Sequence, residues 1–366
     1  MEHPENDDLY KGLKVNKGVA DVPTVNPYLK KRIQRKKYTP AEFVEGILKG
    51  NITILSQAVT LVESSKYEHQ QIAQEIIEKC LPHAGKSVRI GITGVPGAGK
   101  STSIDAFGMH LIGEGRKLAV LAIDPSSERS KGSILGDKTR MEALSREKNA
   151  FIRPSPSAGS LGGVARKTRE TIVLCEAAGF DTVFVETVGV GQSETAVHSM
   201  VDFFLLIQLA GTGDELQGIK RGIMEMADGI IINKADGDNL EKAKLAAAQF
   251  RNALHLFPAP ESGWFPKVLT YSGYYNIGIK EIWDMIGEYM KFTKENGYFN
   301  YKRNEQAKYW MYESINDTLR ETFYHNPAVE NLLVHTEQQV LNNEISSFVA
   351  AKRMMDLFLE NLSAKK

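Results

Sequence analysis

Cysteine is scarce in this chain, which has only Cys80 and Cys175 among its 366 residues. The two lie far apart and form no CxxC pair or Cys/His cluster, so the sequence argues for a reducing compartment and against a structural zinc site. We expect both to be small core residues. An excess of one charge is also lacking, because Lys and Arg together number 45 and so do Asp and Glu. The chain therefore has no overall basic field of the kind that drives nucleic-acid or anionic-membrane binding.

Long apolar runs are absent from the sequence as well. No stretch approaches the roughly 18 uninterrupted apolar residues that a membrane-spanning helix needs. Residues 1–8 are acidic and polar and contain no apolar segment of the kind found in a signal peptide. We therefore expect a cytoplasmic protein that has neither a membrane nor nucleic acid as its partner.

A glycine-rich motif is the strongest positive feature of the sequence. Residues 94–101 match GxxxxGK[ST] at every fixed position, directly after the apolar run 88–92 and before a stretch of helical pattern. The motif consists of Gly94, Val95, Pro96, Gly97, Ala98, Gly99, Lys100 and Ser101. Its glycines let backbone N–H groups surround phosphate oxygens, Lys100 can reach the β and γ phosphates, and the Ser101 hydroxyl can bind Mg²⁺. Together with Thr102 at the positive end of the following helix, the motif predicts a nucleoside triphosphate site. A chance glycine-rich turn would not require this order of strand, motif and helix.

A second motif selects the base. Asn233, Lys234 and Asp236 follow an apolar run as NKxD, in which a carboxylate can accept hydrogen bonds from N1–H and the exocyclic amine of guanine. Adenine has no such pair of donors, so ATP would leave the carboxylate unpaired at a cost of roughly 1 to 3 kcal/mol. An ordinary turn would also favour Asn and Asp, but the position of this segment after the phosphate loop favours GTP recognition.

A third segment, Ser272, Gly273 and Tyr274, follows the last expected strand. GTPases usually place an S-A-x loop there, against the guanine O6. Gly273 departs from the alanine of that pattern. We nevertheless predict that these residues contact the base.

Acidic residues at strand ends are the candidates for Mg²⁺ and water chemistry. Asp124 follows the expected strand 118–123, and Glu186 begins ETVG, which resembles the DxxG switch of many GTPases with Glu in place of Asp. With Ser101, these two carboxylates form the predicted metal set, since Mg²⁺ prefers oxygen ligands. Asp137 is a further catalytic candidate, although a solvated loop aspartate fits its surroundings equally well. Gln192 is a candidate for positioning the attacking water.

Three segments rich in glycine and polar residues are candidates for nucleotide-dependent switches. Residues 125–140 and 188–194 follow the two acidic strand ends, and both are expected to respond to the γ-phosphate. Residues 210–218 also follow a strand and contain several glycines. An exposed loop without a switching role is the commoner interpretation of such a segment.

The alternation of short β-branched runs with helical patterns predicts an α/β fold, a P-loop NTPase with a mostly parallel, doubly wound sheet. The expected strands are 88–93, 118–123, 150–153, 182–186, 203–209, 229–233 and 267–270. We divide the chain into an N-terminal arm and helical prefix (1–85), a GTPase domain (86–295) and a helical C-terminal extension (296–366). In the extension, helices are predicted over 304–325 and 337–362, with an apolar stripe that could pack on the core or on a second subunit.

Together, GVPGAGKS, AIDPSS, VETVGVGQSE, LAGTGDELQGIKRG and NKAD resemble the GTPases associated with methylmalonyl-CoA mutase, the MeaB/ArgK family. That family belongs to the P-loop class (SIMIBI) of the signal-recognition-particle and metal-insertase GTPases. The resemblance covers about residues 39–290 well. It implies a homodimer formed by the C-terminal extension and a chaperone that gates adenosylcobalamin delivery to the mutase and protects or reactivates that enzyme. It also implies phosphate and Mg²⁺ roles for Lys100, Ser101, Asp124, Asp137 and Glu186, and base recognition by Asn233, Lys234 and Asp236.

The cofactor itself is expected to stay with the partner. The sequence contains no DxHxxG, the motif whose histidine binds cobalamin in the mutase. No arginine can be assigned as a catalytic finger either, so we expect slow intrinsic hydrolysis that a partner accelerates.

Three alternatives belong to other functional classes. A nickel or other metal-insertase GTPase would usually show His-rich tracts or a Cys/His site, whereas the eight histidines here are scattered. A protein-targeting GTPase would need affinity for RNA or membranes, which zero net charge does not favour. A P-loop kinase fits the phosphate loop but not the guanine-reading NKxD.

Overall fold

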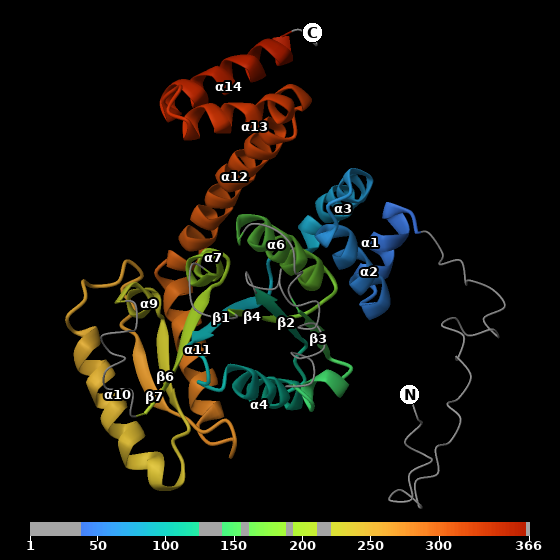
Figure 1. Cartoon of the computed structure of the whole chain (residues 1–366). Helices are drawn as coiled ribbons and strands as arrows, with labels where there is room; N and C mark the ends of the chain where they lie inside the picture. Colours follow the sequence, from blue (N-terminus) through green and yellow to red (C-terminus); the bar gives the residue numbers. More distant parts are fainter. Residues whose placement is uncertain (1–37, 124–140, 155–160, 188–192, 211–220, 364–366) are drawn as a thin grey trace, which may run out of the picture. The chain divides into compact units, whose positions relative to one another are not determined.

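The computed structural model describes residues 38–123, 141–154, 161–187, 193–210 and 221–363 (Figure 1). Residues 40–366 form one compact unit. The proposed division at residues 85 and 295 therefore stays a prediction about segments of this unit.

A seven-stranded sheet forms the centre of the fold. Its strands are β1 (Val88–Gly94), β2 (Leu118–Ile123), β3 (Ala150–Arg153), β4 (Thr182–Thr187), β5 (Phe203–Leu209), β6 (Gly229–Asn233) and β7 (Lys267–Thr270). The strand order is β3-β2-β4-β1-β5-β6-β7, and every pairing is parallel. Because β1 lies in the middle and its neighbours β4 and β5 come later in the chain, the loop after β1 opens at a switch point of the topology, where α/β proteins bind ligands. The expected α/β fold with a parallel, doubly wound sheet is thus confirmed.

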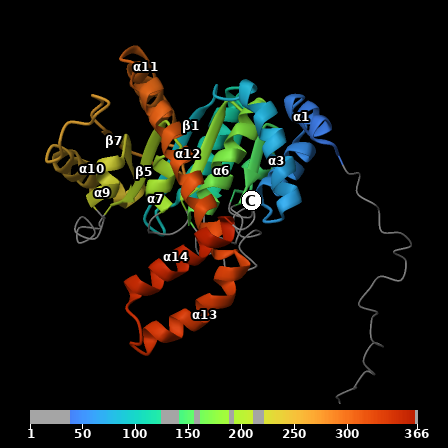
Figure 2. The same cartoon turned by 90° about the horizontal axis from the view of Figure 1, so that it is seen from above.

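Helices cover both faces of the sheet (Figures 1 and 2). One face packs against α4 (Lys100–Gly113) and α11 (Ile279–Glu295). The other face packs against α6 (Leu161–Ala177), α7 (Ser193–His198), α9 (Arg221–Met226) and α10 (Leu240–Leu254). Coverage on both sides explains why β2 is apolar along its whole length and why both β2 and β6 are buried at every position.

Three helices precede the sheet: α1 (Pro40–Leu48), α2 (Ile52–Glu63) and α3 (Tyr67–Cys80), with a 3₁₀ turn at Leu81–His83. Asn51 caps α2 as the sequence predicts, since its side-chain oxygen accepts hydrogen bonds from the backbone N–H groups of Thr53 and Ile54. The three helices pack on one another and on α6. An ion pair between Glu63 and Arg153 of β3 adds a polar contact to that packing.

Three further helices follow α11: α12 (Tyr298–Tyr324), α13 (Pro327–Leu341) and α14 (Ser347–Ser363). The helix predicted over 337–362 is wrong, because the chain turns between α13 and α14. Asn343 adopts a left-handed backbone with φ 58°, which ends α13, and the Ser346 hydroxyl accepts a hydrogen bond from Val349 N–H at the start of α14. Figure 2 shows α13 and α14 side by side, and Val329, Met354 and Phe358 form a small core between them.

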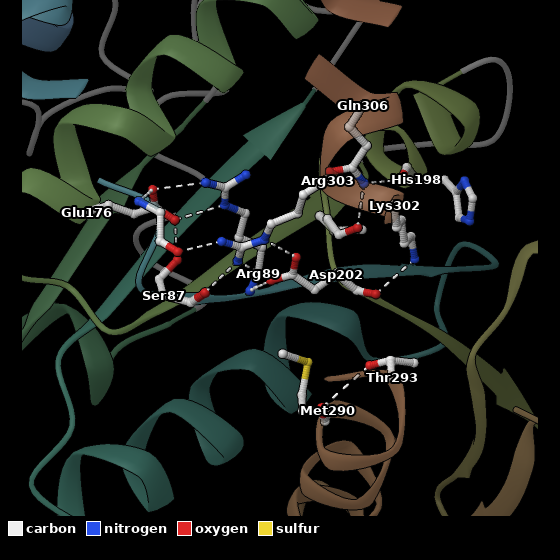
Figure 3. Close-up of polar contacts among 12 residues, drawn as sticks. Ser87, Arg89, Glu176, His198, Asp202, Met290, Thr293, Lys302, Arg303 and Gln306 are labelled. Atoms are coloured by element: carbon white, nitrogen blue, oxygen red, sulfur yellow. Dashed lines mark hydrogen bonds and ion pairs between the residues drawn. The ribbon is translucent and has the colours of Figure 1, made fainter. Parts of the chain in front are cut away.

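Hydrogen bonds and an ion pair connect the first turns of α12 to the edge of the sheet where the strands begin (Figure 3). Arg303 donates to both carboxylate oxygens of Asp202, just before β5, at 2.8 and 2.7 Å. It also donates to the carbonyl of Ser87, just before β1. Lys302 forms an ion pair with Asp228, just before β6. One helix thus contacts the starting ends of three neighbouring strands.

The two cysteines are free and buried, as expected of core residues. Burial raises the pKa of Cys80 to about 11 and raises that of Cys175 as well. No helix among the described residues has both the length and the apolar character needed to span a membrane.

Candidate functional site

The phosphate loop lies between the end of β1 and the start of α4, at the edge where the strands end. Gly97 and Gly99 have φ values of +79° and +87°, in the left-handed region that favours glycine. Gly99 is the residue just before α4, so the loop leads directly into the positive end of that helix. This is the arrangement that the motif predicts for binding phosphate groups.

Lys100 and Ser101 occupy the first turn of α4. The Lys100 ammonium donates to the carbonyl of Gly94 at 2.8 Å, which folds the side chain back over the loop. Burial lowers the pKa of Lys100, while the negative charges of Glu186 and Glu194 oppose that shift. The Ser101 hydroxyl lies 3.4 Å from a carboxylate oxygen of Glu186.

Glu186 is 5% exposed and lies in β4, the strand beside β1. Parallel pairing brings the ends of these two strands to the same edge, so the predicted pair of Ser101 and Glu186 does meet at the phosphate loop. A hydroxyl and a carboxylate at this distance are both oxygen ligands of the kind that Mg²⁺ prefers. No group of three or more His, Cys, Asp and Glu side chains gathers within the described part of the chain to form a metal site.

The NKxD segment follows β6. Asp236 is half-buried, and its carboxylate accepts a hydrogen bond from the Ser272 hydroxyl. Lys234 has a φ of 59°, a backbone conformation that costs a non-glycine residue free energy and that is concentrated at functional sites. The predicted base-reading residues of two separate segments are therefore in contact.

Asn233 connects the phosphate loop to the base-reading segments. Its side-chain amide donates to the carbonyl of Ala98 at 2.7 Å, and its oxygen accepts from Gly273 N–H at 3.1 Å. A Cβ on Gly99 would lie 2.6 Å from the same amide nitrogen, so a side chain there would push the two segments apart. The Asn of NKxD is thus a buried bridge between the two segments, and its contact with the base stays a prediction.

A cavity of about 840 Å³ lies beside these segments. Thr102 of α4 lines it on one side, and Gly273 and Tyr274 line it on the other. These three residues belong to the predicted nucleotide-binding set, although they come from opposite ends of the GTPase core in sequence.

Several predicted residues lie outside the described part of the chain. These are Asp124, Asp137 and Gln192, together with residues 125–140, 188–192 and 211–218, which make up most of the three proposed switch segments. Their roles stay predictions.

Three residues of the site were not predicted from the sequence. Ser103 lies 3.5 Å from the Asn233 amide, Tyr271 lies under the loop that begins at Ser272, and Glu194 is buried close enough to Lys100 to affect its pKa. Only Glu194 carried a signal, as the acidic residue of a glycine-rich segment after Glu186. The other two are ordinary neighbours of the motifs in sequence.

Comparison with known proteins identifies a matching family. Residues 55–328 match the model of the family described as methylmalonyl-CoA mutase-associated GTPase MeaB. GTPase ArgK of Escherichia coli is 44% identical over 87% of this chain and 96% of its own length. The mouse protein named methylmalonic aciduria type A homolog, mitochondrial, is 44% identical over 86% of this chain and 78% of its own length.

A solved structure extends the similarity to the fold. The crystal structure of a protein named LAO/AO transport system kinase matches with a TM-score of 0.70 and 38% identity. The match covers 88% of this chain and 99% of that one.

Proposed function

Because this chain belongs to the MeaB family of methylmalonyl-CoA mutase-associated GTPases, we propose that its nucleotide state controls an acyl-CoA mutase that depends on adenosylcobalamin. The chain is a P-loop GTPase. The finer proposal is that it gates delivery of adenosylcobalamin to methylmalonyl-CoA mutase, or to a related acyl-CoA mutase, and protects or reactivates that enzyme.

The proposed nucleotide site joins the three loops at the ends of β1, β6 and β7. The backbone of 94–99 and Lys100 hold the phosphates, Asp236 reads the guanine N1–H and amine, and the 272–274 loop faces O6. The single observation that carries this assignment is the contact network through Asn233, which holds the phosphate loop and the base-reading loops at a fixed separation.

Mg²⁺ fits the same site. Ser101 and Glu186 would hold it, with Asp124 as the third proposed ligand, either directly or through water. The bound ion would neutralise charge that develops on the β and γ phosphates during hydrolysis. The chain's own part is to keep Ser101 and Glu186 together at the end of two paired strands.

We further propose that Asp137 and Gln192 assist hydrolysis and that the reaction is slow without a partner. The partner would order the segments that follow Asp124 and Glu186. Adenosylcobalamin would stay on the mutase, in keeping with the lack of a DxHxxG motif in this sequence.

A homodimer completes the proposal. The helices α12, α13 and α14 form an apolar groove of about 750 Å³. Leu341 and Phe348 beside it are 72% and 87% exposed. Apolar side chains gathered at one surface are typical of a protein–protein interface. We propose that a second copy of this chain covers them.

The decisive experiment tests partner binding directly. Purified protein is immobilised, and binding of methylmalonyl-CoA mutase is measured with a non-hydrolysable GTP analogue, with GDP and without nucleotide. We expect a complex whose affinity differs between the GTP and GDP states, because the proposed switch segments are expected to respond to the γ-phosphate.

Lys100→Ala should abolish the difference between nucleotide states, whereas Lys86→Ala, at an exposed lysine before β1, should leave it unchanged. Absence of any complex in all three nucleotide conditions would overturn the partner assignment while leaving the GTPase site intact.

A further inference from the structure

Gly273 stands where the S-A-x loop of other GTPases has alanine, and the structure shows what occupies the space of the missing methyl group. A Cβ built on Gly273 would lie 2.9 Å from the hydroxyl oxygen of Tyr271 and 3.3 and 3.4 Å from two of its ring carbons. The first distance is shorter than real Cβ contacts allow. Since the backbone of Gly273 is not in the left-handed region, the tyrosine is the obstacle to a side chain there.

Tyr271 cannot move aside easily. It is 1% exposed and is one of the largest fully buried side chains of the described structure. Its ring belongs to the main hydrophobic core, together with Ala98 of the phosphate loop and Ile104 of α4. A close-packed interior resists displacement of such a ring.

The backbone of Tyr271 is also fixed on both sides. Its N–H donates to the carbonyl of Ile232 in β6, and its carbonyl accepts from the N–H of Ala235 in the NKxD segment, both at 2.9 Å. Because Asp236 is the next residue after Ala235, these hydrogen bonds fix the position of Tyr271 relative to Asp236.

The turn from Ser272 to Ile277, which packs against the Tyr271 ring, is closed by backbone hydrogen bonds, but none of these involves Gly273. Ser272 and Ile277 exchange two backbone hydrogen bonds of 3.0 Å, which closes the turn. Gly273 itself has more backbone freedom than any other residue would have. Two contacts limit that freedom: the hydrogen bond from Gly273 N–H to the Asn233 side chain, and packing against the ring and hydroxyl of Tyr271.

We propose that Tyr271 is a positioning residue of the guanine site, whose ring and hydroxyl fill the place of the alanine methyl group and hold the Gly273 backbone at the guanine O6. Gly273 and Tyr271 thus form a matched pair, in which each residue requires the other. This inference rests on the proposed guanine site. It deepens that proposal by naming the residue that fixes the O6 contact.

The tyrosine hydroxyl has a steric role in this pair. It lies near Ser103 but makes no hydrogen bond of normal geometry within the described residues. Burial raises the pKa of Tyr271 to about 12, so the hydroxyl stays neutral under ordinary conditions. Its removal should therefore loosen the packing against Gly273.

The test is a double-mutant cycle with Gly273→Ala, Tyr271→Phe and the combination of both. Overpacking in the first variant should weaken GTP binding about tenfold. Tyr271→Phe removes the closest atom and should have a smaller effect by itself. In the double variant the added methyl has more room, so the combined loss should be smaller than the sum of the two single losses.

Two analogues separate positioning of the loop from general damage to the site. The 6-thio analogue of GTP changes only the atom that the 272–274 loop should read, whereas inosine triphosphate lacks only the amine that Asp236 should read. Gly273→Ala should reduce the preference for GTP over 6-thio-GTP. The preference for GTP over inosine triphosphate should stay the same. The double variant should regain part of the lost O6 preference.

Gly287→Ala is the matched control, because a Cβ there meets no atom within 4 Å. It should bind both analogues as the unmodified protein does. Thermal unfolding of every variant checks that the fold persists. Additive losses in the cycle, or an unchanged O6 preference in Gly273→Ala, would refute the role of Tyr271. Failure of the guanine site itself would show separately, as loss of the GTP preference over inosine triphosphate in the unmodified protein.

Discussion

Asp236 is the carboxylate on which nucleotide choice depends in the proposed site. One of its carboxylate oxygens accepts a hydrogen bond from the Ser272 hydroxyl, and a carboxylate has acceptor positions for more than one donor. Asp236→Asn replaces one acceptor by a donor, which suits the 2-oxo group of xanthine instead of the 2-amino group of guanine. We expect GTP affinity to fall about 10- to 100-fold, the range for a hydrogen bond to a charged group. Affinity for xanthosine triphosphate should rise, as measured by titration with fluorescent nucleotides.

Asp238→Asn provides the comparison for that substitution. Asp238 is exposed in the short 3₁₀ turn that follows Asp236, so the same chemical change there should leave both affinities as they were. If xanthosine triphosphate binds no better to the Asp236 variant, this carboxylate does not face the base.

Some residues of the site were predictable because a short motif places them. Lys100 and Ser101 are fixed relative to the phosphate loop by their position in the first turn of a helix, and Asp236 is fixed by the strand before it. Ser103 and Asn233, in contrast, are 130 positions apart and approach one another only because β1 and β6 end at the same edge of the sheet. No local pattern encodes that approach, and the contact of Tyr271 with Gly273 depends on core packing in the same way.

At the scale of elements, strands were easier to predict than the final helices. Five of the seven strands have the predicted bounds, because a strand buried on both faces is a short apolar run with polar residues at its ends. The helix predicted over 337–362 failed because Asn342 and Asn343 end α13 by local backbone geometry, while apolar residues continue on both sides of the turn. A pattern of apolar residues alone does not distinguish one bent helix from two antiparallel ones.

Glu176 fastens α6 to the beginning of β1 (Figure 3). Its side chain is 1% exposed and accepts two hydrogen bonds from Arg89, one from the Ser87 hydroxyl and one from Gly85 N–H. Glu176→Gln leaves the Arg89 charge buried without its partner. We expect the free energy of unfolding to fall by about 3 kcal/mol at neutral pH, as measured by denaturant unfolding.

The loss of stability in Glu176→Gln should become smaller as the pH falls. Burial raises the pKa of Glu176, but hydrogen bonds and charge from Arg89, with smaller effects of Ser87 and Gly85, leave the net pKa below the ordinary value of 4.5. The stability that the ionised group contributes is therefore complete above about pH 4.5 and lost as the pH falls through the lower pKa of the folded state. The difference between the variant and the unmodified protein should shrink in that acid range. Glu142→Gln, in an exposed pair with Arg146, should change stability little at any pH.

At the scale of the whole molecule, the chain separates its proposed nucleotide site from its proposed dimer surface. The phosphate loop lies where the strands end, whereas α12 is fastened where β1, β5 and β6 begin. A change on α13 or α14 should therefore alter self-association without disturbing the groups that bind GTP. This separation makes the dimer testable independently of the nucleotide site.

The double substitution Leu341→Lys and Phe348→Lys places two charges at the most exposed apolar positions beside the groove. Burying those charges against a second copy would cost several kcal/mol each without partners. We therefore expect the unmodified protein to sediment as a dimer and the variant as a monomer with unchanged GTP affinity. Leu256→Lys, at a 78% exposed leucine after α10, is the control and should remain dimeric. Sedimentation velocity distinguishes a dimer surface from an apolar face that another partner covers. If the double variant still dimerises, the dimer interface lies elsewhere. If the unmodified protein stays monomeric at every concentration, a second copy does not cover this groove.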